Sequence, residues 1–367
     1  MRFLIALLSF IIVGGSTQAQ WTIQQSHTTA SLRGIHALGN GVAWASGSQG
    51  TVLHTTDDGT TWQTCTTPPD AEQLDFRAIQ AFDAQTAIVM SSGKGDLSRL
   101  YKTTDACKSW TLLFTNPDAE GLWVALVFTK PSDGFLLGNP VKADDGQMRF
   151  AYFQTGDGGT IWHALHHGPK AYQATQAIPG ATVSGASNSS LLIFGTKPTV
   201  ITGGTRAYMV EELGAVICDC IPQPPPDSIY HRLVSLPLAE GPAAGASSDS
   251  GYNDRTIVVG GDPARPNESW GTAAYPKSSE PFAAFVRAET PPHGFRSSVA
   301  HAALHTWITV GPNGTDISID DGKNWHPLKS SPSDQPDADR DWNALSLPFV
   351  VGPHGRIGKL RPDALNH

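Results

Sequence analysis

Three arginines hold similar positions in separate parts of the sequence. Each follows an apolar residue and precedes a small one: Arg33, Arg77 and Arg296. A guanidinium group presents parallel N–H donors that match a carboxylate or phosphate group. If the three side chains converge, they form a binding site for an anion or a carboxylate-bearing ligand.

Two further segments place Trp123 and Asn343 at the same position, so these residues complete a candidate ligand-binding cluster. The competing interpretation is structural. Each arginine could instead pair with a nearby acid, such as Asp75 or Asp341, and stabilise the contact between neighbouring repeats. The ligand-binding interpretation requires the elements that carry these residues to meet around one centre.

Other chemistry finds less support in the sequence. Glycoside hydrolysis needs two carboxyl groups roughly 5–10 Å apart, and Asp75, Glu120 and Asp262 come from different segments with no common spacing. The 13 histidines form no cluster with metal-ligand spacing, although His166 and His167 are adjacent. No phosphate-binding glycine loop is present. We therefore predict no catalytic residue, no metal site and no cofactor.

The elements that position these residues are indicated by an eight-residue motif, [S/T]-x-D-x-G-x-x-W, which begins at Thr55, Thr103, Thr155 and Ser318. Its Asp can accept backbone N–H bonds, its Gly can take a positive φ, and its Trp can bury a large surface. The motif is thus typical of a turn between antiparallel strands, and Cys107 replaces Gly in the second copy. The residues with this structural role are Asp57, Gly59, Trp62, Asp105, Trp110, Asp157, Gly159, Trp162, Asp320, Gly322 and Trp325.

The spacing of the motif predicts the architecture. Successive motif tryptophans lie 48, 52 and 163 residues apart, and the last interval is about three repeat lengths. Two degenerate repeats are therefore expected between Trp162 and Trp325, with strands at Ser190 to Phe194, Ala207 to Val210, Arg255 to Gly260 and Thr272 to Tyr275. Each repeat is long enough for four short strands, the arrangement of a β-propeller blade.

The chain ends complete the ring. The last repeat, from Asn343 to Leu360, lacks a motif and an outermost strand, and Trp21-Thr22-Ile23 offers the missing strand. Pairing the two termini in one blade also removes free sheet edges. The fold class predicted is all-β: a seven-bladed β-propeller of four-stranded antiparallel blades, closed by the N-terminal strand, with residues 20–367 as a single domain.

The N-terminal residues predict an exported protein, and the net charge disfavours binding to nucleic acid. Residues 1–19 combine Arg2, an apolar run from Phe3 to Val13 and a small-residue site ending at Ala19, as in a signal peptide. The run has 11 residues, whereas a membrane-spanning helix needs roughly 20. The formal net charge of −8 disfavours nucleic acid. We expect a monomeric periplasmic or extracellular protein with no transmembrane segment in the mature chain.

The four cysteines permit disulfides in such a compartment. Cys65 follows the first motif by three residues and Cys107 lies inside the second, so the outer turns of neighbouring blades could bring them together. Cys218 and Cys220 are two residues apart, and a direct bond between them would strain a strand. A Cys65–Cys107 disulfide and free thiols both remain open.

The motif copies resemble BNR/Asp-box repeats, which occur in sialidases, other glycoside hydrolases and many non-enzymatic propellers. The mature chain more closely resembles the photosystem II stability/assembly factor-like group of exported bacterial propellers. The stretches that carry this resemblance are Leu32–Ile35, Leu74–Arg77, Gly138–Val141, Val259–Asp262, Gly294–Ser297, Val310–Asp316 and Val351–Ile357. The resemblance implies an exported seven-bladed propeller, whose relatives in photosynthetic organisms are assembly scaffolds for a membrane complex.

The sialidase likeness implies three arginines on a substrate carboxylate and a late tyrosine nucleophile. Here the last tyrosine, Tyr275, precedes Arg296, and the Phe76-Arg77-Ala78-Ile79 stretch lacks the Pro of the family's Phe-Arg-Ile-Pro motif. The function predicted is therefore a non-enzymatic binding or assembly scaffold for a protein, a small anion or a glycan. The alternative is a sialidase-like glycoside hydrolase or lyase that acts on an extracellular glycan.

Overall fold

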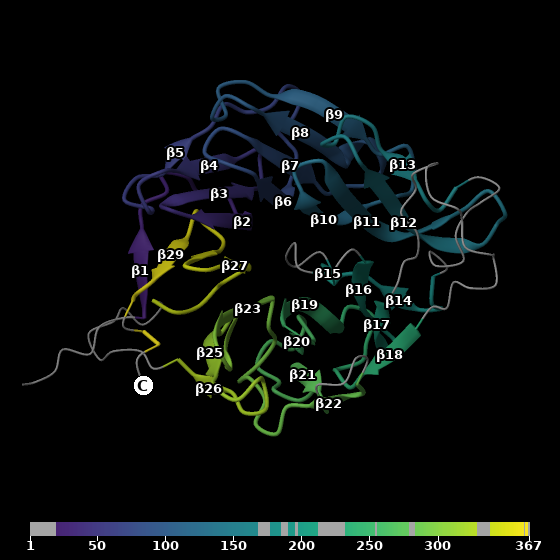
Figure 1. Cartoon of the computed structure of the whole chain (residues 1–367), viewed down its shortest axis with the longest axis vertical. Coiled ribbons are helices and arrows are strands. Elements are labelled where there is room, and N and C mark those ends of the chain that lie inside the picture. Colours follow the sequence, from purple (N-terminus) through teal and green to yellow (C-terminus); the bar gives the residue numbers. More distant parts are fainter. Residues whose placement is uncertain are drawn as a thin grey trace, which may run out of the picture.

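The computed structural model describes residues 20–167, 177–184, 190–194, 197–211, 232–253, 255–278, 283–328, 338–362 and 364–365. Apart from one 3-10 turn, η1 (Gly95–Leu97), the elements in these ranges are β-strands. Their antiparallel sheets are arranged radially around a common centre (Figure 1). Within the same ranges, no helix has the length and apolar character needed to span a lipid bilayer.

The predicted signal segment, residues 1–19, and the pair Cys218 and Cys220 lie outside the described residues. The signal peptide and the single domain over residues 20–367 stay predictions.

Three sheets follow the sequence from the centre of the ring outward, with four strands each. The first contains β2 (Leu32–Gly39), β3 (Val42–Gly47), β4 (Val52–Thr55) and β5 (Gln63–Thr64). The second contains β6 (Phe76–Ala81), β7 (Ala87–Ser91), β8 (Arg99–Thr103) and β9 (Thr111–Thr115). The third contains β10 (Trp123–Lys130), β11 (Asp133–Lys142), β12 (Met148–Thr155) and β13 (His163–Ala164).

A nine-stranded sheet follows, in which one residue pair, Gly203 with Gly245, joins two four-stranded groups. The first group is β15 (Leu191–Phe194), β16 (Lys197–Gly204), β17 (Ala207–Glu211) and β18 (Arg232–Leu236), and β14 (Ala181–Thr182) adds to β16. The second is β19 (Gly245–Tyr252), β20 (Arg255–Gly261), β21 (Ala273–Pro276) and β22 (Phe285–Arg287). The strands predicted for the two degenerate repeats are thus confirmed as β15, β17, β20 and β21.

The last two sheets close the ring. One contains β23 (Ser298–Ala303), β24 (Thr306–Gly311), β25 (Gly314–Ser318) and β26 (His326–Pro327). The other contains β27 (Ala344–Ser346), β28 (Phe349–Val351), β29 (Ile357–Leu360) and β1 (Trp21–Gln24). Apart from β14, the described strands therefore fall into seven groups of four. The prediction of an all-β propeller with four-stranded antiparallel blades is confirmed.

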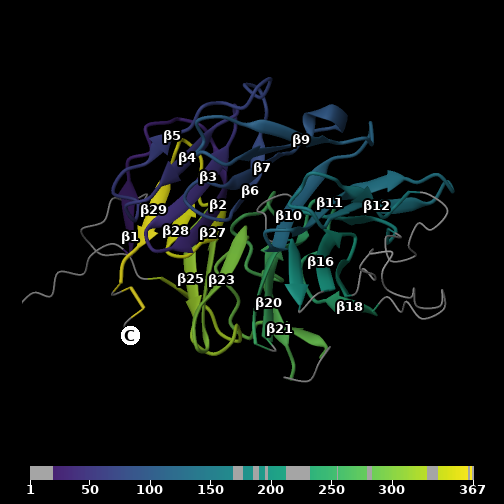
Figure 2. The same cartoon turned by 45° about the horizontal axis from the view of Figure 1, so that its top comes forward.

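Closure by the N-terminal strand is also confirmed. In β1, Trp21 pairs with Leu360 of β29, and the two strands lie side by side in both views (Figure 1 and Figure 2). The Trp21 indole is buried against Trp342, with ring centroids 6.0 Å apart, and its Nε1 donates to Thr315 Oγ1 over 3.0 Å. The strand therefore joins the last blade to its neighbour as well as completing its own sheet.

The motif turns join the third and fourth strands of four blades. Asp57 accepts the Thr61 N–H over 2.9 Å, while Thr55 Oγ1 accepts the Gly59 N–H over 3.0 Å. Gly59 has a φ of 78°, which favours glycine. The bond from the Thr61 N–H holds the pKa of Asp57 below its usual range. Equivalent bonds recur at Asp105, Asp157 and Asp320.

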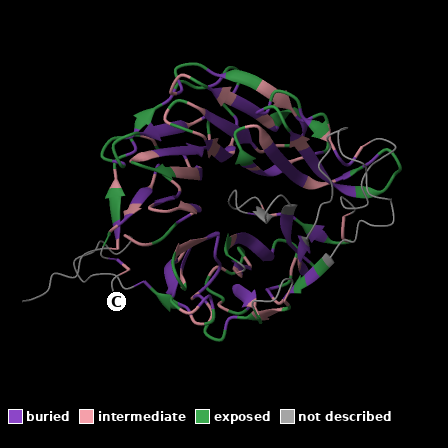
Figure 3. Cartoon of the chain, in the orientation of Figure 1, coloured by how far each residue is buried: buried purple, intermediate pink, exposed green. Residues whose placement is uncertain are grey.

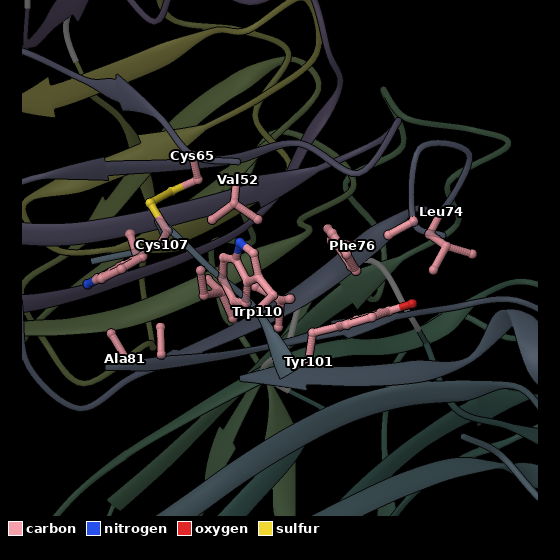
Figure 4. Packing of buried hydrophobic residues seen from close by; sticks show 13 residues of the cluster. Val52, Cys65, Leu74, Phe76, Ala81, Tyr101, Cys107 and Trp110 are labelled. Atoms are coloured by element: carbon pink, nitrogen blue, oxygen red, sulfur yellow. A yellow bond between two sulfur atoms is a disulfide. The ribbon is translucent and has the colours of Figure 1, made fainter. Parts of the chain in front are cut away.

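The apolar cores lie between neighbouring blades. Figure 3 shows the inner strands mostly buried, whereas the outermost strands β5 and β26 are exposed. The core between the first two blades contains Val52 of β4, Phe76 of β6 and Tyr101 of β8, packed around Trp110 (Figure 4). At its rim, Cys65 and Cys107 form a disulfide with Cα atoms 5.3 Å apart. This bond links the outer turns of two adjacent blades.

Candidate ligand-binding site

A β-bulge near the start of the inner strands decides where the candidate arginines point. In β2, Leu32 pairs with Gly47 and Gly34 pairs with Ser46, so Arg33 is the extra residue. In β6 the same irregularity leaves Arg77 between the paired residues Phe76 and Ala78. A bulge leaves its extra residue outside the ladder and redirects the side chain. Arg33 and Arg77 therefore emerge at equivalent positions of adjacent blades.

The two arginines share one carboxylate. Arg33 Nε lies 3.2 Å from Asp75 Oδ1, and Arg77 Nε lies 3.1 Å from Asp75 Oδ2. The side chains of Arg33, Arg77 and Asp75 are 33%, 32% and 26% exposed. The group therefore joins two blades, as the structural interpretation predicted for Asp75. It also places two partly exposed guanidinium groups at a surface that a ligand can reach.

Arg296 does not belong to this group, and its prediction as a ligand-binding residue is wrong. Its side chain is fully buried. Nε donates to Asp316 Oδ2 over 2.8 Å, Nη1 donates to the Phe295 carbonyl over 2.9 Å, and Nη2 also contacts Asp316. Burial lowers the pKa of Arg296, against the raising effect of Asp316. This guanidinium neutralises an internal carboxylate and has no contact with solvent.

The sequence alignment of the repeats places Arg296 one residue away from its true position. In β23, Ser298 pairs with Val310 of β24 as Gly34 pairs with Ser46, and the preceding Ser297 donates its N–H to the Val310 carbonyl. Ser297 thus holds the position of Arg33, and Arg296 holds that of Leu32. A shift of one residue moves a side chain to the opposite face of a strand. A small residue followed by an aliphatic one, as in Gly34-Ile35 and Ser298-Val299, would have given the correct alignment.

Trp123 is wrongly predicted for the same reason. It pairs directly with Gly138, so Val124 is the bulged residue of β10. The Trp123 side chain is fully buried and stacks on Phe114, with ring centroids 5.3 Å apart. It is a core residue between the second and third blades and cannot contact a ligand.

Asn343 does occupy the position of Arg33. Its N–H donates to the Val351 carbonyl over 2.8 Å, as Ser297 donates to Val310 in the preceding blade. Its Nδ2 donates to the Leu32 carbonyl over 2.7 Å, which joins the last blade to the first. The half-buried side chain lies next to the residue that precedes Arg33, at the edge of the arginine pair.

The end of the ring at which β2 and β6 begin is here named the arginine face. Because the blades are antiparallel, the β28–β29 turn and the segment before β2 lie at the same end, and Leu32 donates its N–H to the Gly352 carbonyl there. These segments form a groove of about 710 Å³. Its lining includes His27, Asp341 and Arg356, and the Arg356 guanidinium lies 4.6 Å from the Trp342 ring centroid. A polar groove therefore lies on the blade next to Arg33.

A second polar cluster lies at the boundary of the second and third blades. Asp118 precedes β10, and His166 and His167 follow β13. Asp118 Oδ2 lies 2.9 Å from His166 Nε2, and Asp118 Oδ1 lies 2.6 Å from His167 Nε2. These three side chains have the geometry of a group that could hold a metal ion. The sequence showed only the adjacent histidines, because Asp118 is 48 residues from His166.

The carboxylates considered for glycoside hydrolysis each have a cationic neighbour. Asp75 contacts Arg33 and Arg77, Glu120 contacts Lys94 over 2.7 Å, and Asp262 contacts Arg265 over 2.8 Å. The hydrogen bond from Arg265 lowers the pKa of Asp262, which is unfavourable for a general acid. Asp262 is therefore poorly suited to act as the general acid of a hydrolase.

Comparisons with known proteins establish the fold. No protein-family model matches the sequence, and no curated protein matches it. The structure titled "YCF48 bound to D1 peptide" matches with a TM-score of 0.60 at 15% identity and covers 95% of this chain and 100% of that chain. YCF48 from Cyanidioschyzon merolae matches with a TM-score of 0.60 at 18% identity, over 94% and 100% of the two chains.

A GH74 xyloglucanase from Xanthomonas campestris is also similar. Its TM-score is 0.57 at 14% identity, and the match covers 94% of this chain and 54% of that chain. At these identities the comparisons show the architecture alone. The chain has a β-propeller fold like that of YCF48, as the sequence resemblance implied.

Proposed function

We propose that this protein is a non-enzymatic binding propeller whose arginine face binds a carboxylate-bearing segment of a partner protein. The observation that carries the proposal is the pair formed by Arg33 and Arg77 around Asp75. Both guanidinium groups contact Asp75 through Nε and are about a third exposed, so a carboxylate of a ligand can approach them.

The geometry of Arg33 supports this proposal. Arg33 contacts Asp75 through Nε, and about a third of its side chain is exposed. The Nη1 and Nη2 edge of a guanidinium can receive a carboxylate by two parallel N–H donors. An aspartate, a glutamate or a free C-terminus of the partner fits this edge, and the groove around His27 and Arg356 can hold the adjoining residues of the partner.

The comparisons support a peptide as the ligand. The structure titled "YCF48 bound to D1 peptide" shares the fold and nearly the full length of this chain, so a propeller of this form can bind a peptide. The net charge of −8 disfavours nucleic acid. Within this negative protein, a local positive site selects acidic segments by electrostatic complementarity.

The deciding experiment is charge reversal. The purified protein is tested on an array of acidic peptides with free or amidated C-termini, and the bound peptides are then titrated against Arg33→Glu/Arg77→Glu. Loss of two charge-assisted contacts should weaken binding at least tenfold. The matched control is Lys130→Glu, whose side chain is 63% exposed and pairs with Asp133 at the opposite end of the ring. Equal affinity in the double variant and the control would contradict the proposal.

A glycoside hydrolase of the same fold is the competing function, favoured by the similarity to the GH74 enzyme. A panel of neutral and acidic polysaccharides incubated with the purified protein separates the two. Release of reducing sugar that survives Arg33→Glu/Arg77→Glu would replace the binding proposal by the enzymatic one.

We further propose that the protein acts outside the cytoplasm as a monomer. The signal-like residues 1–19 and the Cys65–Cys107 disulfide support export to an oxidising compartment. Cell fractionation combined with mass spectrometry of the N-terminus tests this, and cleavage after Ala19 is expected. Light scattering of the purified chain tests the monomer.

A further inference from the structure

We propose that Asp118, His166 and His167 form a binding site for a divalent transition-metal ion, with Zn²⁺ as the best match. The site is separate from the arginine pair and its test is independent of the proposed function. Three candidate ligand atoms, one carboxylate oxygen and two imidazole nitrogens, lie within 4.8 Å of one another. A set of two histidines and one carboxylate leaves a fourth position for water or another ligand.

The distances between the ligand atoms suit a small tetrahedral ion. Metal–ligand bonds of about 2.0–2.2 Å place the ligand atoms of a tetrahedron ~3.3–3.6 Å apart. Asp118 Oδ2 lies 2.9 Å from His166 Nε2, and Asp118 Oδ1 lies 2.6 Å from His167 Nε2. Each of these two contacts must therefore lengthen by up to ~1 Å to admit the ion. His167 is 30% exposed and can make this adjustment, whereas His166 is fully buried.

The His166 ring is already oriented by the backbone. Its Nδ1 lies 3.0 Å from the Tyr152 nitrogen and 3.1 Å from the Tyr152 carbonyl oxygen. In one tautomer the Tyr152 N–H donates to Nδ1, and in the other a protonated Nδ1 donates to the carbonyl. Metal binding through Nε2 requires the second tautomer, in which the Tyr152 N–H gives up its bond to Nδ1 while the ring does not rotate. Such a backbone contact on the far nitrogen is the usual support of a metal-binding histidine.

His167 has the equivalent support from a carboxylate. Its Nδ1 lies 3.1 Å from Asp144 Oδ1, while Nε2 faces Asp118. A carboxylate on the second nitrogen raises the basicity of a ligating imidazole and holds its orientation. Asp144 lies between β11 and β12, Asp118 lies before β10, and the histidines follow β13. A bound metal would therefore connect the segment before β10 with the segment after β13, and Asp144 would extend the contact to the loop between β11 and β12.

The charge of the cluster also favours a dication. Two neutral imidazoles and the Asp118 carboxylate carry one negative charge, and the Asp144 carboxylate lies next to His167. Lys94, the cation next to Glu120, is 62% exposed and is paired with that glutamate over 2.7 Å. The group formed by Asp118, His166 and His167 thus offers oxygen and nitrogen donors with a negative charge, which is the environment that Zn²⁺ requires.

The test uses the purified protein after treatment with a chelator, titrated with Co²⁺ and then with Zn²⁺. One equivalent of Co²⁺ should produce the intense visible absorption of tetrahedral coordination, and Zn²⁺ should displace it. The variants Asp118→Asn and His167→Ala should lower the Co²⁺ affinity at least tenfold. Asp144→Ala removes only the carboxylate that contacts His167 Nδ1, and it should lower the Co²⁺ affinity by about 10–100-fold.

Two matched controls distinguish ligands from neighbours. Glu120→Gln removes an exposed carboxylate two residues from Asp118, and His163→Ala removes an exposed histidine four residues before His167. Both should bind Co²⁺ as the unaltered protein does. Circular dichroism in chelator checks folding, and His167→Gln serves if His167→Ala does not fold. The proposal is overturned if the unaltered protein shows no stoichiometric Co²⁺ band, or if the ligand variants bind as tightly as the controls.

Discussion

Leu32 and Arg296 occupy the same position of the propeller repeat, although one is apolar and the other is charged. Each lies one residue before the position that Arg33 and Ser297 share, and each side chain is fully buried between blades. In the sixth blade an internal ion pair with Asp316 thus takes the place of apolar packing. Arg296 is part of the core and Arg33 is part of the surface.

This difference predicts opposite responses to mutation. Arg296→Ala removes the arginine partner of the fully buried Asp316 and should lower the free energy of unfolding by about 3–5 kcal/mol. Arg33→Ala removes a partly exposed ion pair and should cost about 0–1 kcal/mol. Urea unfolding followed by tryptophan fluorescence measures both. Equal losses in the two variants would show that Arg296 is not buried as the structure has it.

The same ion pair makes stability depend on pH through His293. The hydrogen bond to Asp316 raises the pKa of His293 above 6.5, although burial and the charge of Arg296 oppose this. The group that faces it from β25 is Asp316, whose pKa burial raises but whose contacts with His293 and Arg296 hold it below 3.8. The stabilisation by protonated His293 is therefore fully present below pH 6.5 and is lost as the pH rises through its folded-state pKa.

His293→Gln should accordingly destabilise the protein more at pH 5.5 than at pH 8.5. Thermal unfolding at both pH values gives the two differences from the unaltered protein. His301→Gln is the control, because His301 stacks on Tyr252 and has no carboxylate contact among the described residues. A constant difference across this range for His293→Gln would refute the role of its charge.

The Cys65–Cys107 disulfide should contribute about 2–4 kcal/mol of stability, because it closes a loop with a sequence separation of 42 residues. The expected result is a lower unfolding midpoint in Cys65→Ala/Cys107→Ala. Cys107 also has a φ of 59°, at the motif position where Gly59 has a φ of 78°. Glycine adopts this conformation without strain.

The variant Cys65→Ala/Cys107→Gly separates these two effects. It should be more stable than Cys65→Ala/Cys107→Ala, because it removes the same cross-link but restores glycine at a positive φ. Chemical denaturation of both variants with and without reductant measures the difference. Neither variant contains the Cys65–Cys107 disulfide, so a reductant should not change its unfolding midpoint. A shift would indicate that another disulfide stabilises the protein.

The N-terminal strand should be required for a stable ring. The Trp21 side chain of β1 is buried against the preceding blade. Trp21→Ala should therefore lower the free energy of unfolding by about 3–5 kcal/mol. Ile23→Ala on the same strand removes a side chain that is 44% exposed and should have a much smaller effect. Hydrogen exchange of the β29 amides measures local opening, and unchanged protection in Trp21→Ala would contradict closure by β1.

The propeller could be predicted from local features. The Asp, Gly and Trp of each motif copy act within eight residues, as the contacts from Asp57 to Thr61 and from Thr55 to Gly59 illustrate. Their spacing along the chain then indicates the number of repeats. The missing outer strand of the last repeat predicted that β1 pairs with β29, since a ring of such repeats has no other source for it.

The candidate site depended on information of a different kind. Arg33 and Arg77 align with each other in the sequence. Arg296 and Trp123 are placed correctly, at the position of Leu32, only if the bulge in each inner strand is known. A shift of one residue alters no composition and no spacing of the motifs, yet it moves a side chain from the surface into the core.

The sequence by itself determined the strand order, the turns and the closure of the ring, because these follow from contacts between near neighbours and from repetition. Only the tertiary structure decided which side chains are accessible and which meet. Asp118 and His166 are far apart along the chain and adjacent in space, and Arg33 and Arg77 are oriented by one shared carboxylate. Such contacts depend on the register of strands and on the packing of neighbouring blades, which no local pattern encodes.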